Sequence, residues 1–335
     1  MRNAEFRQQM KSEKPPVSLD DVYQAQETIS KFLERTPLLH PLSLSRILDC
    51  QAYLKLENTL PTGAFKVRGG VNLIANLSET EKRRGVIAAS TGNHAQSIAY
   101  AAQLFGVKAV IGMPEGANPV KVEATRGFGA TVELHGKDYD EAREWVEAEA
   151  RRKNYRYIHS ANEPLLIAGV GTLYLEIMQQ QPDLDVVIVP IGGGSGAAAA
   201  CIVAKAINPN VKIIGVQAEK APAVYRSWKT GRLSRTRFAD TFAEGLATRF
   251  AFKMTFDILH SMIDEIVLAS EEEIKLAIVM LLETAHQLAE GAGAASTAAA
   301  FRLKEELRDK RVALTLTGGN LALTTLKTIL DKLGT

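Results

Sequence analysis

A lysine in a turn is the residue of this chain whose surroundings most favour covalent chemistry. Lys66 lies in the run Pro-Thr-Gly-Ala-Phe-Lys-Val-Arg-Gly, residues 61–69, where a helix is predicted to begin. Ala64 and Phe65 before it indicate partial burial, which lowers the pKa of an ammonium group and releases the neutral amine that imine formation requires. Many lysines beside apolar residues only extend their amine to water, so this position gains meaning from two further loops.

A glycine-rich loop is the second candidate. It follows an apolar strand at residues 186–191, precedes an alanine-rich helix at residues 197–207, and consists of Gly192, Gly193, Gly194 and Ser195. Backbone N–H groups at the start of a helix bind anions, and phosphate is the obvious one. The spacing also fits a dinucleotide-binding turn, with Glu219 near the place of the ribose-binding acid, and it fits a plain tight turn. The pattern alone leaves these three interpretations open.

The third candidate loop is rich in side chains that form hydrogen bonds. It consists of Ser90, Thr91, Gly92, Asn93 and His94, between a strand predicted at residues 86–89 and a helix predicted at residues 95–105. Hydroxyls, an amide and the N–H groups of a helix start together suit a carboxylate. A helix cap does not need four polar side chains, so ligand binding is the better interpretation.

The three loops are expected to meet at one crevice. A further strand at residues 312–315 leads to Thr317 and a glycine pair, and in an open parallel sheet the ligand binds at the carboxyl ends of the strands. An anion cradle, a carboxylate clamp and a reactive amine together describe pyridoxal phosphate holding an amino acid as an imine. A dinucleotide-dependent oxidoreductase would explain the glycine run alone.

Composition narrows the class of protein. The chain has 335 residues, 46% hydrophobic and 23% charged, as in globular proteins with a large core. A net charge of +2 gives no electrostatic reason to expect nucleic acid or an anionic membrane as a partner. No apolar run reaches the ~20 residues of a membrane span, the polar N-terminus lacks a signal-peptide core, and the two cysteines have no metal-ligand spacing. We therefore predict a cytoplasmic protein without a metal site.

Strand-like segments alternate with helix-periodic ones, which predicts an α/β protein with mostly parallel sheets. Strands are predicted at residues 52–56, 86–89, 109–113, 131–134, 155–159, 186–190, 213–217, 265–268 and 312–315. A loose tail is predicted at residues 1–16. One helix is predicted to start at Asn118-Pro119, and another to start at the capping box of Ser270 and Glu273 and to stop at Gly291.

The motifs and their order resemble the serine/threonine dehydratase and serine racemase group of fold-type II pyridoxal-phosphate enzymes. The resemblance runs from about Leu19 to the C-terminus. Besides the three loops, the segments that carry it are Lys55-Leu-Glu57, Ile167-Ala-Gly-Val-Gly-Thr172, Ala243-Glu-Gly245 and the final Thr-Gly-Gly-Asn. It implies two open, twisted, mostly parallel sheets flanked by helices, as in the tryptophan synthase β-like fold. A large domain would comprise residues 1–84 and 162–335, a small domain residues 85–161, with the active site in the cleft between them.

The resemblance also implies roles for individual residues. Lys66 would hold pyridoxal phosphate as an imine and then move the Cα proton, with Phe65 packed against the ring. Gly245 would contribute backbone near the substrate. The phosphate would be bound by Gly192, Gly193, Gly194 and Ser195, and the amino-acid substrate by Ser90, Thr91, Asn93 and His94. Asn93 would also lie near the 3′-oxygen of the cofactor.

Two threonines bear on the expected reaction. Thr317 would meet the pyridine nitrogen, and a hydroxyl there does not keep that nitrogen protonated, so the ring is a weaker electron sink and loss of a β-hydroxyl is favoured. Thr91 stands where racemases of this group carry serine, their second acid/base, and where many dehydratases carry alanine. Thr91 keeps the hydroxyl but adds a methyl group that restricts its rotamers. Dehydration is therefore the first expectation.

The expected reaction is conversion of L-threonine to 2-oxobutanoate and of L-serine to pyruvate, with release of ammonia. A serine or other amino-acid racemase is one alternative. A dehydratase for phenylserine, hydroxyaspartate or a hydroxyectoine-derived acid is another. The chain departs from the group at Ala64, where serine is frequent, and at Glu244, where aspartate is usual. A homo-oligomer, dimer or tetramer, is expected from the resemblance.

Overall fold

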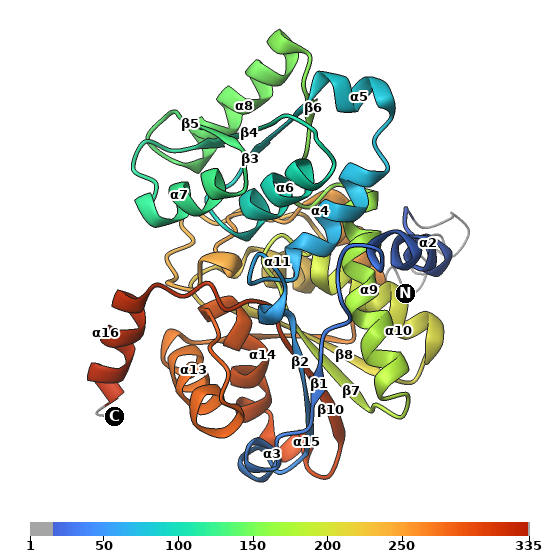
Figure 1. Ribbon diagram of the computed structural model, residues 1–335. Helices are drawn as coiled ribbons and strands as arrows, with labels where there is room; N and C mark the ends of the chain where they lie inside the picture. Colours follow the sequence, from blue (N-terminus) through green and yellow to red (C-terminus); the bar gives the residue numbers. More distant parts are fainter. Residues whose placement is uncertain (1–15, 334–335) are drawn as a thin grey trace.

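Two mostly parallel sheets form the frame of the computed structural model, which describes residues 16–333 (Figure 1). The larger sheet has the order β1 (Leu38–Leu39), β2 (Gln51–Leu56), β10 (Arg311–Leu316), β7 (Val186–Pro190), β8 (Lys212–Ala218) and β9 (Glu265–Ala269). The smaller sheet has the order β5 (Thr131–Leu134), β4 (Ala109–Met113), β3 (Val86–Ala89) and β6 (Arg156–Tyr157). All neighbouring strands are parallel except β1 and β2. The predicted fold class is confirmed.

Helices cover both faces of the larger sheet, which explains why its strands are continuous apolar runs. In β7, Val187 and Val189 contribute to one core cluster, whereas Val186 and Ile188 contribute to the other. The first cluster includes residues of α2 (Leu19–Ile29), α9 (Pro164–Gln180), α10 (Ser195–Ile207) and α12 (Lys253–Met262). The second includes residues of α3 (Leu42–Leu48), α13 (Glu271–Ala285), α14 (Gly291–Arg302), α15 (Lys304–Leu307) and α16 (Leu323–Leu333).

The smaller sheet is likewise flanked by helices (Figure 1). Its helices are α6 (Asn93–Leu104), α7 (Pro119–Gly127) and α8 (Tyr139–Lys153). The other elements are α4 (Lys66–Ala75), α5 (Glu79–Arg84), α11 (Ala223–Thr230) and the 3-10 turns η1 (Glu57–Thr59) and η2 (Glu244–Leu246). The strands of the smaller sheet all lie within residues 85–161. The domain boundaries themselves stay a prediction.

Most predicted elements are present, with three corrections. The helix that starts at Ser270 has its capping box, but it ends at Ala285 because His286 adopts a left-handed conformation with φ of 55°. Gly291 begins the next helix instead of ending this one. The strand predicted at residues 155–159 is only Arg156–Tyr157. Of the predicted tail at residues 1–16, only Pro16 lies within the described residues, and the N-terminus judged for a signal peptide lies outside them.

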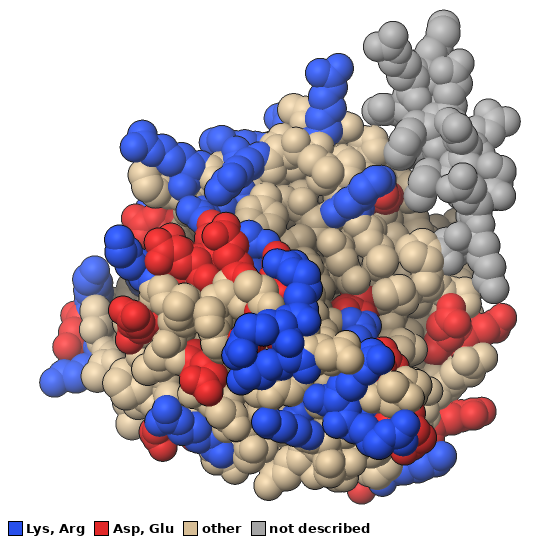
Figure 2. Space-filling model, turned by 90° about the horizontal axis from the view of Figure 1, so that it is seen from above, with Lys and Arg blue, Asp and Glu red and all other residues tan. Residues whose placement is uncertain are grey.

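Charge and hydropathy at the surface are unremarkable for a globular protein. Acidic and basic side chains are interspersed on the face that Figure 2 shows. Between residues 16 and 333, none of the helices combines the length and the apolar character that crossing a bilayer would require.

A buried ionic cluster ties α4 to the larger sheet. Arg68 is 1% exposed, and its guanidinium donates to Glu57 at 2.6 Å and to Glu176 at 2.7 Å. Lys55, fully buried in β2, also contacts Glu176 at 2.6 Å. Two cations and two carboxylates balance in charge, and Thr36 donates a further hydrogen bond of 2.6 Å to Glu57. Such a cluster tolerates no missing partner, since each charge left alone in the interior is poorly solvated.

Replacing Arg68 by alanine should therefore lower the free energy of unfolding by about 3–5 kcal/mol, because two carboxylates lose their buried partner. Urea unfolding, followed by circular dichroism with linear extrapolation, measures this. The matched control is Arg126→Ala, which removes an exposed pair with Glu123 and should change stability little. Equal effects of the two substitutions would contradict the assignment.

Candidate active site

The predicted chemical loops meet at one cavity of about 710 Å³ between the two sheets. Its walls come from the carboxyl ends of β3, β7 and β10 and from the start of α4, as expected for open parallel sheets. All twelve predicted site residues line it: Phe65, Lys66, Ser90, Thr91, Asn93, His94, Gly192, Gly193, Gly194, Ser195, Gly245 and Thr317. The structure thus brings them together, while their individual roles stay predictions. Glu219, the acid of the dinucleotide interpretation, is exposed and does not line this cavity.

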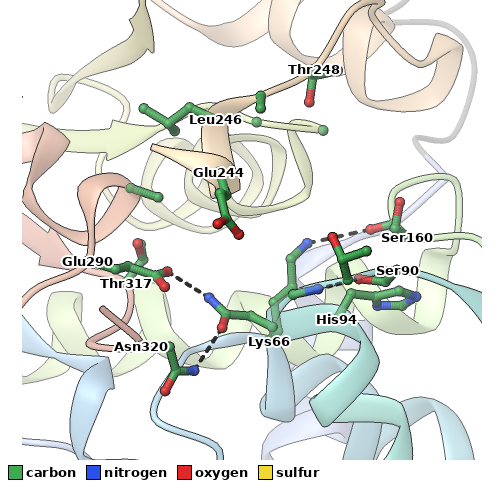
Figure 3. A pocket seen from close by; sticks show the side chains of 18 of the residues that line it. Lys66, Ser90, His94, Ser160, Glu244, Leu246, Thr248, Glu290, Thr317 and Asn320 are labelled. Atoms are coloured by element: carbon green, nitrogen blue, oxygen red, sulfur yellow. Dashed lines mark hydrogen bonds between the residues drawn. The ribbon is translucent and has the colours of Figure 1, made fainter. Parts of the chain in front are cut away.

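Lys66 is the first residue of α4, and its side chain extends into the cavity (Figure 3). Its amine donates a 2.8 Å hydrogen bond to the Ser195 hydroxyl and lies 5.2 Å from the centre of the Phe65 ring. Burial lowers the pKa of Lys66 to about 8. A substantial fraction of the amine is therefore neutral near physiological pH, which is the form that attacks a carbonyl carbon.

The glycine-rich loop has the shape of an anion cradle. A Cβ at Gly192 would overlap the carbonyl oxygen of Gly245, so a larger residue cannot take this place. Gly194 has a φ of +92°, which favours glycine, and it is the N-cap of α10. The loop therefore presents backbone and the positive end of a 13-residue helix to the cavity, beside the Lys66 amine. These residues fit the phosphate and the aldehyde carbon of pyridoxal phosphate.

The Ser-Thr-Gly-Asn-His loop differs from the prediction in one respect. Helix α6 begins at Asn93 rather than at Ala95, so Asn93 and His94 belong to its first turn. The Ser90 hydroxyl accepts a hydrogen bond from the backbone of Gly92, which closes the turn before the helix. Residues of this loop and of the first turn of α6 line the cavity on the side of the smaller sheet.

Two histidines near the cavity are held in the neutral form. Burial, and after it the charges of Lys66 and His159, lower the pKa of His94 to about 3. Burial, followed by the charge of Arg143, lowers the pKa of His159 to about 4. His94 can therefore contribute hydrogen bonds but no positive charge to a bound carboxylate at neutral pH.

A chain of hydrogen bonds crosses the cavity wall and includes residues that sequence reasoning missed (Figure 3). The side-chain amide of Asn93 donates to Glu290 at 2.6 Å and accepts from Asn320 at 2.8 Å. Asn320 also donates to the carbonyl oxygen of Thr62 at 2.9 Å, next to the lysine turn. One signal could have revealed Glu290, since it is the single charged residue in the small and apolar stretch 288–300.

Ion pairs between distant segments close over the same cavity. Lys121 of α7 pairs with Glu244 of η2, and Arg249 pairs with Asp140 of α8. Each pair joins the region of the smaller sheet to the segment around η2. Only Glu244 of these four residues is exposed, and the other three are half-buried.

Comparisons with known proteins agree with this geometry. The family model described as "Pyridoxal-phosphate dependent enzyme" matches residues 29–318. An L-threonine ammonia-lyase of Thermotoga maritima is 42% identical over 316 residues, which cover 94% of this chain and 79% of that protein.

Solved structures are similar over nearly the full length. Threonine deaminase isoform 2 of Solanum lycopersicum, in its processed form, has a TM-score of 0.89 at 32% identity, covering 96% of this chain and 91% of that one. Maize serine racemase also has a TM-score of 0.89, at 29% identity, covering 94% of this chain and 97% of that one.

The pKa of Lys66 predicts how cofactor loading depends on pH. When protein stripped of cofactor is mixed with pyridoxal phosphate, the rate of imine formation should rise with pH and level off above about 8, where the amine is neutral. Stopped-flow absorbance measures the rate. A rise centred instead near 10.5, the ordinary value, would show that the amine is not desolvated.

Proposed function

The chain belongs to the pyridoxal-phosphate dependent enzyme family, and we propose that it is an ammonia-lyase that acts on L-threonine and L-serine. The products would be 2-oxobutanoate and pyruvate, each with ammonia. The observation that carries the proposal is the desolvated Lys66 amine, 2.8 Å from Ser195 of the anion cradle. The similarity to the Thermotoga maritima L-threonine ammonia-lyase, 42% identical, supports the choice of reaction.

The residues that would hold pyridoxal phosphate are grouped on the larger sheet. The phosphate would lie against the glycine-rich loop and the start of α10, Lys66 would bind the cofactor covalently, and Thr317 would lie at the ring nitrogen. When bound, the cofactor supplies an electron-withdrawing ring that weakens bonds to the Cα atom of an attached amino acid. Phe65 would pack on this ring, and Gly245 would contribute backbone beside the substrate.

The chain itself would orient the substrate and move its proton. Ser90, Asn93 and the N–H groups at the start of α6 would bind the substrate carboxylate, with neutral His94 beside them. The Lys66 amine, with a pKa of about 8, is suited to take the proton from Cα, because its affinity for protons matches the working pH.

The direct test is incubation of the purified yellow protein with a panel of β-hydroxy amino acids. L-threonine should give 2-oxobutanoate and L-serine pyruvate, both measured by coupled reduction with NADH. Lys66→Ala should lose the imine absorbance and lower kcat by at least ~10³-fold, since nucleophile and base are removed together. If only phenylserine, hydroxyaspartate or a hydroxyectoine-derived acid is converted, that compound is the substrate instead. If no β-hydroxy amino acid is converted, the proposal is refuted.

Racemisation is the second candidate, since Thr91 places a hydroxyl in the cavity wall and the maize serine racemase structure is similar. A racemase needs acid/base groups on both faces of the substrate, and Thr91 would serve opposite Lys66. Thr91→Ala should then abolish D-serine formation while leaving pyruvate formation within about tenfold. Chiral chromatography of the products measures both. Equal loss of the two activities would show that Thr91 is not a separate proton donor.

We further propose a cytoplasmic homo-oligomer, a dimer or a tetramer. Helix α16 lies apart from the body of the fold in Figure 1, and its Leu323 is 77% exposed. Cys50 and Cys201 are both buried and unpaired, as is usual in a reducing compartment. Light scattering coupled to size exclusion tests the assembly state.

A further inference from the structure

Glu290 is an ionisable group in the cavity wall to which the proposed reaction assigns no task. It precedes α14 as its N-cap residue, and its backbone N–H donates to the carbonyl oxygen of Gly318 at 3.0 Å. Its carboxyl group does not cap the helix but accepts a hydrogen bond from Asn93, and Figure 3 shows Glu290 among the side chains that line the cavity. A carboxyl group placed in such a wall needs a hydrogen-bonding partner.

That partner fixes an amide in one orientation. Asn93 donates from Nδ2 to Glu290 Oε1 at 2.6 Å and accepts at Oδ1 from Asn320 Nδ2 at 2.8 Å. Rotating the amide by 180° would place nitrogen against nitrogen and oxygen against oxygen, so the two neighbours together exclude the flipped form. An amide nitrogen carries two N–H groups, and the bond to Glu290 uses one of them.

We propose that Glu290 is a positioning residue that orients the Asn93 amide, so that its second N–H is presented to the ring oxygen of bound pyridoxal phosphate. This inference rests on the proposed function, in which Asn93 lies beside the cofactor ring. Glu290 acts through Asn93 and does not itself contact the reacting atoms.

The charge on Glu290 tunes this hydrogen bond. Burial raises the pKa of Glu290 to about 7, against the lowering effects of the Asn93 hydrogen bond and of the Lys121 charge. The charge that acts on it is that of Lys121 from α7, which itself pairs with Glu244 of η2. Above about pH 7 the ionised carboxylate accepts a charge-assisted, stronger bond from Asn93, and below it the neutral acid accepts a weaker one.

The holoenzyme absorption band of the imine tests the proposal, since the band responds to hydrogen bonds at the ring. Glu290→Gln keeps an acceptor for Asn93 but cannot ionise, so its band should stay near the wild-type position and lose the pH-dependent step near 7. Glu290→Ala removes the acceptor, so its band should shift at every pH and kcat should fall about 10- to 100-fold with little change in KM. The matched control is Glu244→Gln, which removes a carboxylate at the same cavity without touching Asn93. It should keep the band position and the pH-dependent step, with the step moved to lower pH because Lys121 loses its partner.

A double substitution isolates the route through Asn93. In an Asn93→Ala background, Glu290→Ala should produce no further band shift, because the amide it orients is gone. A second, additive shift would overturn the proposal, as would a wild-type band and pH profile in Glu290→Ala. If Glu290→Ala does not fold, Glu290→Gln provides the test. An absorption band that still changes near pH 7 in Glu290→Gln would then overturn the proposal.

The outcomes separate this inference from the proposed reaction. A band shift in Glu290→Ala together with no product from any β-hydroxy amino acid would uphold the positioning role and refute the ammonia-lyase. Product formation by the wild type, together with an unshifted band in Glu290→Ala, would uphold the ammonia-lyase and refute the positioning role. Absence of any imine band in the wild type would overturn both.

Discussion

The buried ion pairs of Arg68 constrain everything at this site, because they fix the helix that presents Lys66. The guanidinium of Arg68 is held by Glu57 at the end of β2 and by Glu176 on α9. Lys66 lies two residues earlier in α4, so its backbone stays in place while Arg68 is paired. A charge moved away from these carboxylates would have to enter an apolar core, which costs several kcal/mol. The start of α4 is thereby held where the Lys66 amine reaches the Ser195 hydroxyl at 2.8 Å.

The second constraint is that the site is shared by two sheets. The phosphate cradle and Thr317 come from the larger sheet, whereas the loop from Ser90 to His94 follows β3 of the smaller one. The hydrogen bonds from Glu290 through Asn93 to Asn320 join these two walls. A shift of one sheet relative to the other would therefore first change the distance between the glycine-rich loop and the loop from Ser90 to His94. The internal geometry of each loop would change less. The same chain of bonds gives the wall a defined amide orientation.

Local sequence patterns were sufficient for the fold class and for the three loops that meet at the cavity, whereas Gly245 came only from the family resemblance. Continuous apolar strands, glycine turns and helix caps are short-range signals, and the cavity forms where parallel strands end. Predictions from local sequence patterns were wrong or incomplete where the structure depends on tertiary contacts. Apolar periodicity continued past Ala285, but His286 turns left-handed and Gly291 starts a new helix against β10. Glu290 and Asn320 were missed for the same reason, since each gains its role from a partner about 200 residues away.

The titration behaviour of the cavity follows from desolvation more than from pairing. Burial is the largest influence on the pKa values of Lys66, His94, His159 and Glu290, and it pushes each toward its neutral form. Near neutral pH both histidines are uncharged, so a substrate carboxylate cannot be bound by an imidazolium here. In the proposed function, its attraction would come from the N–H groups that begin α6 and from the loop hydroxyls. Of these four groups the Lys66 amine has the highest pKa and is therefore the strongest base, as the proposed removal of a proton from carbon requires.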